Sequence, residues 1–153
     1  FYVEDNNYVT LDGKVFLTNL SNNEVIYVPD VKEITHESCI FHTNIKKIYM
    51  NINLEKINYG AFSYCFNLEN VYLNDGLKEI CDHSFYACES LKYVVIPESV
   101  EKIGKHAFSH GIIYCEALEK PQEWHNEFAT HNATVIWGNE WEYNEDGIPV
   151  VIK

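Results

Sequence analysis

Apolar and polar positions follow a pattern that repeats every 23 residues along the middle of the chain. Each repeat places an isoleucine at one position and, in the three clearer repeats, a phenylalanine five residues further on. A unit this short cannot bury its apolar face alone, so it becomes stable only by stacking on its neighbours. The pattern therefore predicts a solenoid whose interior is lined by these residues. They are Ile34, Ile57, Ile80, Ile103, Phe62, Phe85 and Phe108.

Within one unit the pattern predicts a strand, a turn, a second short extended piece and a short helix. Leu68 to Leu73 alternates its side chains as a strand does, Gly76 lies in the turn, and the second extended piece ends at Ile80. The segment that carries Phe85 is expected to be the helix. The expected fold class is a β-rich α/β solenoid, a leucine-rich repeat stack of parallel strands with short helices, capped at both ends.

The repeat sets the expected domain boundaries. Residues 25–115 form about four repeats, of which the first is degenerate. Residues 1–24 lack the repeat, and Asp12-Gly13 lies between two apolar runs, which predicts a hairpin that caps the N-terminal end. Residues 116–153 leave the register, and we expect them to form a C-terminal cap and the start of a following segment.

The repeat unit resembles that of the BspA-like (Treponema pallidum type) leucine-rich repeat family. The residues that carry the resemblance lie in Gly60 to Leu73 and Leu91 to Phe108, and the segment from Tyr114 to Gly138 looks like the closing segment of bacterial members. A continuous asparagine ladder is absent, because the turn position holds Asn53, Gly76 and Ser99. The resemblance implies a cell-surface or secreted protein, used for adhesion or for binding host and matrix proteins.

Charge excludes some partners. The net charge is −12, all eleven basic residues are lysine, and residues 45–110 are nearly neutral, with eight acids and seven lysines, between acidic flanks. An acidic chain without arginine repels polyanions and lacks the bidentate fork that favours phosphate. The sequence also contains no apolar run long enough to cross a bilayer. We therefore expect that the chain binds no nucleic acid, does not insert into a membrane, and has a protein as its partner.

The histidine and cysteine pattern favours packing over chemistry. His83 and His106 occupy the same repeat position, which predicts a stacked pair on a turn surface instead of a zinc site. Cys65 and Cys88 also share a position, and we expect buried free thiols, although adjacent coils leave a disulfide conceivable. Nothing matches a nucleophile with its base or a phosphate loop. We therefore expect no enzyme activity, catalytic residue, metal or cofactor.

One row of outward-facing positions is the candidate binding site. We call it the tyrosine row, and alternation along each strand predicts that all its members point away from the core. The row is either cross-strand packing that stabilises the sheet or a protein-binding face. Its members are Tyr27, Tyr49, Tyr72, Val95 and Tyr114.

The expected function is a non-catalytic protein-protein interaction or adhesion module of a bacterial cell-surface or secreted protein. One alternative is an accessory spacer repeat domain of a larger surface protein. Another is a carbohydrate-binding module that uses the C-terminal cluster Trp124, Trp137 and Trp141.

Overall fold

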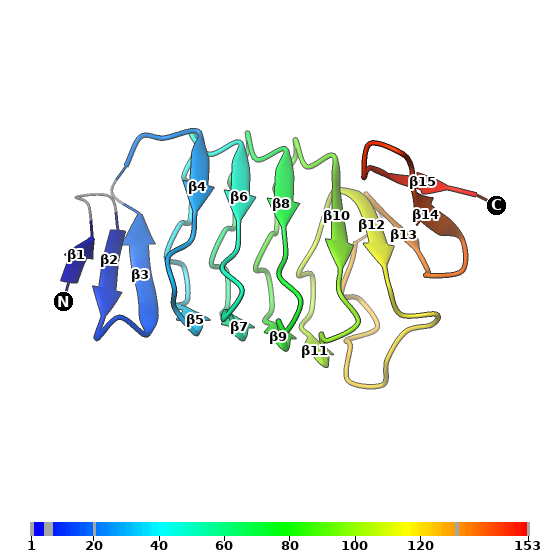
Figure 1. The fold of residues 1–153 in the computed structure, drawn as a ribbon, viewed down its shortest axis with the longest axis horizontal. Coiled ribbons are helices and arrows are strands. Elements are labelled where there is room, and N and C mark those ends of the chain that lie inside the picture. The colour runs from blue at the N-terminus through cyan, green and yellow to red at the C-terminus, as the bar shows by residue number, and fades with distance from the viewer. Residues whose placement is uncertain (1, 5–7, 20, 131, 153) are drawn as a thin grey trace.

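The computed structural model describes residues 2–4, 8–19, 21–130 and 132–152. The chain winds into a row of stacked coils that runs from the N-terminus to the C-terminus (Figure 1). The four coils within residues 25–110 each contribute one strand to each of two sheets, named sheet A and sheet B below, and the strands within residues 111–136 extend sheet B alone. In the part of the chain that the structure describes, no helix is long and apolar enough to cross a membrane.

Sheet B lies along one side of the stack and its neighbouring strands are all parallel. Its described strands are β4 (Val25–Tyr27), β6 (Lys47–Tyr49), β8 (Asn70–Tyr72), β10 (Tyr93–Ile96), β12 (Gly111–Cys115) and β13 (Ala133–Ile136), in this spatial order. Residues at equivalent repeat positions pair with each other in neighbouring strands, as Tyr49 does with Tyr72 and Val71 with Val94. The predicted parallel stack with one strand per repeat is confirmed.

Sheet A contains the second short strand of each coil and extends into the N-terminal segment. Its parallel strands are β5 (Glu33–Ile34), β7 (Lys56–Ile57), β9 (Glu79–Ile80) and β11 (Lys102–Ile103), and β3 (Val15–Asn19) pairs parallel with β5. β2 (Tyr8–Leu11) and β1 (Tyr2–Glu4) add antiparallel strands beyond β3. Asp12 and Gly13 both have positive φ, 53° and 64°, and the backbone N–H of Lys14 donates to the Leu11 carbonyl at 3.0 Å. The connection between the paired residues Leu11 and Val15 therefore has three residues, one more than the predicted two-residue turn. The hairpin forms at the N-terminal end of the stack (Figure 1).

The core is a set of ladders that run along the stack. Phe62, Phe85 and Phe108 are fully buried, and each ring is parallel to the next with 5.3 Å between centroids. The isoleucines of sheet A are at most 2% exposed. The sequence prediction that these residues are buried is confirmed.

The predicted short helices are wrong, because the structure has no helix among the described residues. The segment before Cys65 is a series of turns, in which alternate N–H groups bond to different partners. Phe62 and Tyr64 donate to carbonyls of the next coil, whereas Ser63 and Cys65 donate to carbonyls three residues back. A helix needs every N–H to point along its own axis. Half of the backbone N–H donors in this segment therefore form hydrogen bonds between coils and are not available to a helix.

The turn segments also contain residues in the left-handed backbone conformation, which a helix does not accommodate. Tyr64, His83 and Ala87 have φ of 61°, 59° and 58°, and a left-handed residue interrupts a right-handed helix. The sequence indicated this break at one place only, since Gly60, the repeat equivalent of His83, also has a positive φ of 60°.

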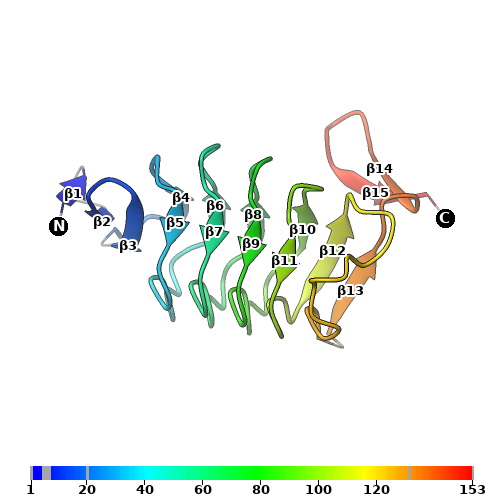
Figure 2. The same cartoon turned by 90° about the horizontal axis from the view of Figure 1, so that it is seen from below.

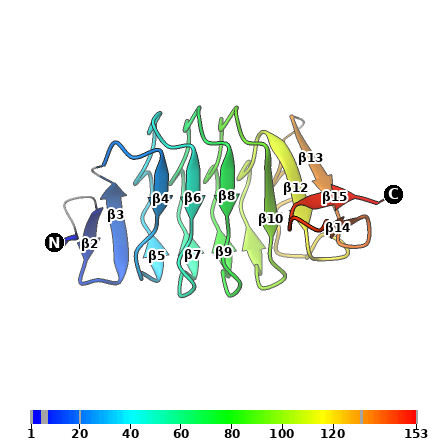
Figure 3. The ribbon, with the colours of Figure 1, turned by 45° about the horizontal axis from the view of Figure 1, so that its top comes forward.

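The C-terminal residues close the stack and then form a separate hairpin. Trp124 and Phe128 are buried against the last coil, and the indole N–H of Trp124 donates to the Val100 carbonyl at 3.1 Å. β14 (Trp141–Tyr143) and β15 (Pro149–Val151) form an antiparallel pair that stands against the C-terminal end of the stack (Figures 2 and 3).

Two of the three rings of the tryptophan cluster are buried. Trp124 and Trp141 are 2% and 8% exposed, and Trp137 is half-buried with its ring centroid 6.1 Å from that of Trp124. A carbohydrate-binding platform needs open aromatic faces. The burial of these rings therefore argues against the alternative that placed sugar binding on this cluster.

The cysteines are free, and Cys65 and Cys88 are fully buried as predicted. Their thiols donate to carbonyls of the preceding coil, from Cys65 to Cys39 at 3.3 Å and from Cys88 to Phe62 at 3.2 Å. Burial raises the pKa of Cys65 to about 12 and that of Cys88 well above its ordinary value. These thiols are packing residues.

Candidate functional site

The outer face of sheet B is built by alternation along its short strands. Ile48 points into the core and is fully buried, while Lys47 and Tyr49 on either side of it are only half-buried. The same alternation holds in β10, where Val94 and Ile96 are buried and Tyr93 and Val95 are not. Because the coils are in register, outward side chains of successive strands form rows across the sheet.

Three members of the tyrosine row form a continuous stack. The rings of Tyr27 and Tyr49 lie 5.0 Å apart at 11°, and those of Tyr49 and Tyr72 lie 4.6 Å apart at 15°. Tyr27 is 65% exposed, while Tyr49 and Tyr72 are half-buried because each ring covers the next. Val95 is half-buried in the next strand. These four residues form an aromatic and apolar ridge that solvent reaches.

Tyr114 is the exception in the predicted row. It pairs with Val95 in the sheet, but it is only 5% exposed. The ring of Trp141 in β14 lies 5.4 Å from the Tyr114 ring, and the Trp141 indole donates to the Cys115 carbonyl at 2.9 Å. The prediction that Tyr114 is available on the surface is wrong, because the C-terminal hairpin folds over this end of the row.

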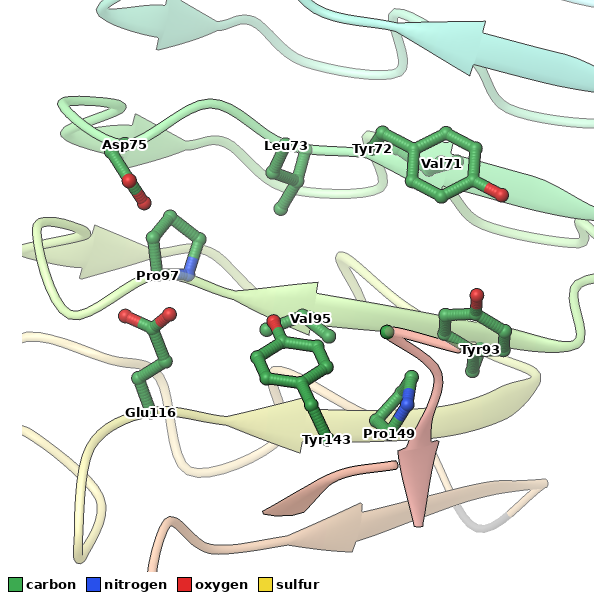
Figure 4. A pocket seen from close by; sticks show the side chains of 11 residues that line it. Val71, Tyr72, Leu73, Asp75, Tyr93, Val95, Pro97, Glu116, Tyr143 and Pro149 are labelled. Atoms are coloured by element: carbon green, nitrogen blue, oxygen red, sulfur yellow. The ribbon is translucent and has the colours of Figure 1, made fainter. Parts of the chain in front are cut away.

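Sequence reasoning missed the hollow beside the row. A cavity of about 200 Å³ lies between β8, β10 and the β14–β15 hairpin (Figure 4). Tyr72, Tyr93 and Pro149 form one end, Leu73, Val95 and Tyr143 lie in the middle, and Asp75, Pro97 and Glu116 form the other end. We call this cavity the hollow. Alternation along the strand could have placed Tyr93 on the outer face, since it lies two residues before Val95. No pattern in the sequence indicated that Tyr143 would lie beside them.

The hollow is partly desolvated and electronegative. The pKa of Tyr143 is raised, first by burial and then by the nearby carboxylates of Glu116 and Asp75. The pKa of Tyr72 is raised by burial and by the adjacent Tyr93. Both phenols therefore keep their protons at neutral pH and can donate hydrogen bonds.

A second aromatic cluster, also missed from the sequence, lies on the turn segments that lead from sheet A to sheet B. Phe41 stacks on Tyr64 at 4.6 Å and 11°. His83 and His106 are in contact on the turn surface, as their shared repeat position predicted, but their rings meet edge-on at 5.5 Å and 81° and are not stacked. The pKa of His83 is lowered, first by burial and then by His106. Ala87 takes the place of the next ring, so the Phe41–Tyr64 stack ends after two coils.

The described residues hold no group of three or more His, Cys, Asp or Glu side chains that could bind a metal ion. Burial raises the pKa of Cys81 to about 11, so this half-buried thiol is protonated near neutral pH. The geometry of the outer face suits recognition of another molecule through aromatic rings and two carboxylates.

Comparison with known proteins gives a family and a set of folds. The family model described as BspA type Leucine rich repeat region matches residues 4–115 in six copies. The chain is also similar to the crystal structure of the pneumococcal vaccine antigen PcpA, with 22% identity and a TM-score of 0.66 over 86% of this chain and 35% of that one. No curated protein matches the sequence.

Two further solved structures share the fold. The T. pallidum leucine-rich repeat protein TpLRR has 19% identity and a TM-score of 0.65, over 89% of this chain and 64% of that one. A leucine-rich repeat protein from Bacteroides capillosus has 21% identity and a TM-score of 0.61, over 88% of this chain and 97% of that one. The chain thus spans about a third of PcpA and less than two thirds of TpLRR.

Proposed function

The chain belongs to the BspA-type leucine-rich repeat family, and from this premise we propose that it is a non-catalytic protein-interaction module that binds its partner through the outer face of sheet B. Solenoids of this kind commonly use an extended sheet surface for binding, because each repeat adds one strand and one row of side chains to it. The proposal assigns the contact to Tyr27, Tyr49, Tyr72 and Val95, with Tyr114 as a buried support.

The observation that carries the proposal is the stacked and solvent-accessible series Tyr27, Tyr49 and Tyr72. Tyrosine offers a large, rigid and amphipathic surface, and it is enriched among the residues that dominate binding energy. Mutual stacking holds the rings in one orientation before a partner arrives. Binding then loses little side-chain entropy.

The charges beside the row support the same assignment. Lys46 pairs with Glu24 at 3.0 Å, and Lys92 pairs with Glu69 at 3.1 Å, each across neighbouring coils. These pairs neutralise the border of the row within a chain of net charge −12. A neutral border opposes an approaching protein less than an acidic one does.

The cellular setting is part of the proposal. We place the module in a bacterial cell-surface or secreted protein that adheres to host, matrix or other surface proteins. The family resemblance supports this setting, and one structural neighbour is described as a vaccine antigen. The second candidate function is a spacer within a larger surface protein, which the partial coverage of PcpA favours.

The test compares two double variants that remove equivalent rings from different sides of the coil. Tyr27→Ser with Tyr49→Ser removes an exposed and a half-buried stacked ring from the row, without touching the hollow. Phe41→Ser with Tyr64→Ser removes a pair of matching exposure and geometry from the turn segments. Binding to immobilised matrix proteins and surface extracts is measured for both.

The proposal expects the first variant to lose binding by tenfold or more and the control to keep it. Equal binding by all three proteins would overturn the assignment to sheet B. Absence of binding by the wild type would favour the spacer.

A further inference from the structure

We propose that the hollow receives a lysine or arginine side chain from the protein partner that lies along the tyrosine row. This inference rests on the proposed function and deepens it, because it names the chemistry that the partner must present.

The size of the hollow selects a single side chain. Its volume of about 200 Å³ is below the range of roughly 300 to 1,000 Å³ that is usual for pockets that bind whole small molecules. Tyr72 and Tyr93 form one wall and Tyr143 with Pro149 forms the other, while Leu73 and Val95 lie between them (Figure 4). A slot with apolar sides suits the aliphatic stem of lysine or arginine, which buries its methylenes while the charged head reaches a polar end.

The polar end of the hollow carries negative charge without a cation to balance it. Asp75 and Glu116 both line it, and none of the lining residues is a lysine. The backbone N–H of Glu98 donates to one oxygen of Glu116 at 2.9 Å, which orients that carboxylate. No described residue forms an ion pair with Asp75 or Glu116, so the second oxygen of Glu116 and the Asp75 carboxylate can accept from a partner.

Several other carboxylates of the stack do have a lysine partner. Among the described residues, five lysines form ion pairs with glutamates of neighbouring coils: Lys32, Lys46, Lys56, Lys92 and Lys105. Neither Asp75 nor Glu116 takes part in such a pair. Asp75 and Glu116 are thus among the acidic residues that the stack leaves without a lysine partner, and a cation from outside would supply one.

The aromatic walls add a second attraction for a cation. A lysine ammonium or arginine guanidinium over a tyrosine face gains about 0.5 to 1 kcal/mol at an exposed site and more when desolvated. A neutral apolar side chain would instead desolvate two carboxylates without compensation, and an acidic side chain would be repelled. Charge complementarity therefore favours a lysine or arginine side chain in the hollow over an apolar or acidic one.

Tyr72 links the hollow to the row. Its ring stacks on Tyr49 on one side and lines the hollow on the other. A partner segment that crosses the row therefore reaches the hollow at its next contact. The two sites form one surface, in which the row supplies aromatic contact and the hollow selects for positive charge.

The first experiment uses capped tripeptides as probes of the hollow. Acetyl-Gly-Lys-Gly-amide and its arginine counterpart are titrated into the protein, with the norleucine and Nε-acetyl-lysine peptides as uncharged controls. The readout is the NMR chemical shift of the Leu73 and Val95 methyl groups. The proposal expects saturable shifts with the two cationic peptides and affinities at least tenfold weaker for the uncharged ones. Equal shifts with norleucine, or no shift with any peptide, would overturn it.

The second experiment assigns the effect to the two carboxylates. Asp75→Asn with Glu116→Gln keeps the shape of the hollow and removes both charges. The matched control, Glu119→Gln with Glu123→Gln, changes the net charge by the same amount at exposed positions outside the hollow. Loss of the lysine-dependent shifts in the first variant but not in the second supports the proposal, whereas equal loss in both overturns it as a bulk-charge effect.

The Tyr27→Ser/Tyr49→Ser variant separates this inference from the proposed function. Neither substituted residue lines the hollow, and only the Tyr72 wall loses a stacking neighbour. The variant should therefore still bind the lysine tripeptide in preference to the norleucine one while losing the protein partner. If it keeps the protein partner, the row fails as the binding face whatever the peptides do. If partner binding depends on the row but the Asp75→Asn/Glu116→Gln variant binds the partner normally, the row stands and the charge-selecting role of the hollow fails.

Discussion

The ring of Phe85 lies parallel to that of Phe62, 23 residues earlier in the chain, with 5.3 Å between the centroids and 8° between the planes. The same spacing recurs between Phe85 and Phe108 at 7°. Neighbouring strands of a sheet lie about 4.8 Å apart, so the rings repeat nearly at the distance of the backbone. Each phenylalanine therefore contacts the coil before it and the coil after it, and its loss affects both interfaces.

Phe85→Ala is expected to lower the free energy of unfolding by roughly 3 to 5 kcal/mol, through lost burial and a cavity between two fully buried rings. Chemical denaturation of the wild type and the variant measures the difference. Phe41→Ala is the control, because Phe41 is 57% exposed, and its effect should be much smaller. Equal effects of the two substitutions would contradict the stacked core.

Gly104 is expected to tolerate no side chain, because its coil passes too close to the previous one. A Cβ at Gly104 would lie 2.4 Å from the backbone nitrogen of Asp82 and 2.8 Å from its Cα, so the coils would have to separate. Gly104→Ala should cost at least the 1 to 3 kcal/mol that is typical of overpacking.

The control for this prediction is Gly13→Ala in the hairpin turn. A Cβ at Gly13 meets nothing within 4 Å, so only its positive φ of 64° opposes alanine, at about 1 to 2 kcal/mol. Thermal melting of both variants measures the contrast. A larger loss at Gly13 than at Gly104 would show that the coils are less closely stacked than described.

The buried thiols predict a loss of stability at alkaline pH. The pKa of Cys65 and of Cys115 is raised by burial from 9.0 to about 12, so the folded state holds these protons more tightly than the unfolded chain does. Their contribution is fully present below pH 9 and is lost as the pH rises from about 9 towards 12. Denaturant titrations at pH 8 and pH 10 measure the decline. Cys65→Ala should show a shallower decline, and an unchanged slope would show that the Cys65 thiol does not contribute.

Trp141→Ala tests the cover over Tyr114. The substitution removes the ring that packs on Tyr114 and leaves the Cys115 carbonyl without its indole donor. We expect the free energy of unfolding to fall by about 3 to 5 kcal/mol, as is typical when a buried tryptophan is replaced by alanine. The Tyr114 ring should also become accessible to iodination, and the backbone amides of β12 should exchange with deuterium faster. Continued protection of Tyr114 in a folded variant would mean that another segment covers it.

The sequence predicted those features that repeat. Ile57, Ile80 and Ile103, and the phenylalanines with them, recur at a fixed step, so their shared burial and the parallel strands could be inferred from periodicity. The helices could not be excluded in this way. The spacing of Phe62 and Cys65 suits a helical turn, and what prevents the helix is the bonding of alternate N–H groups to the next coil, which is a tertiary effect.

The candidate site was predictable to the same extent. Alternation placed Tyr27, Tyr49 and Tyr72 on one face, because each follows a buried residue in a strand of known register. The burial of Tyr114 and the hollow both depend on where the β14–β15 hairpin folds back. That contact joins Trp141 to Cys115, which is 26 residues earlier. Because Trp141 lies outside the repeat, the 23-residue periodicity could not predict the contact.

The tyrosine row should contribute to binding far more than to folding. Tyr27 and Tyr49 are a cross-strand pair on the outer face, and such pairs contribute roughly 0.2 to 1 kcal/mol to stability. A tyrosine that becomes buried in an interface can instead contribute about 2 kcal/mol or more to binding. Melting curves recorded beside the binding measurements should therefore show a small loss of stability for Tyr27→Ser/Tyr49→Ser and a similar loss for Phe41→Ser/Tyr64→Ser, which removes the other stacked pair. Binding should fall in the first variant alone. A clear drop in melting temperature with unchanged binding would show that the row only holds neighbouring strands together.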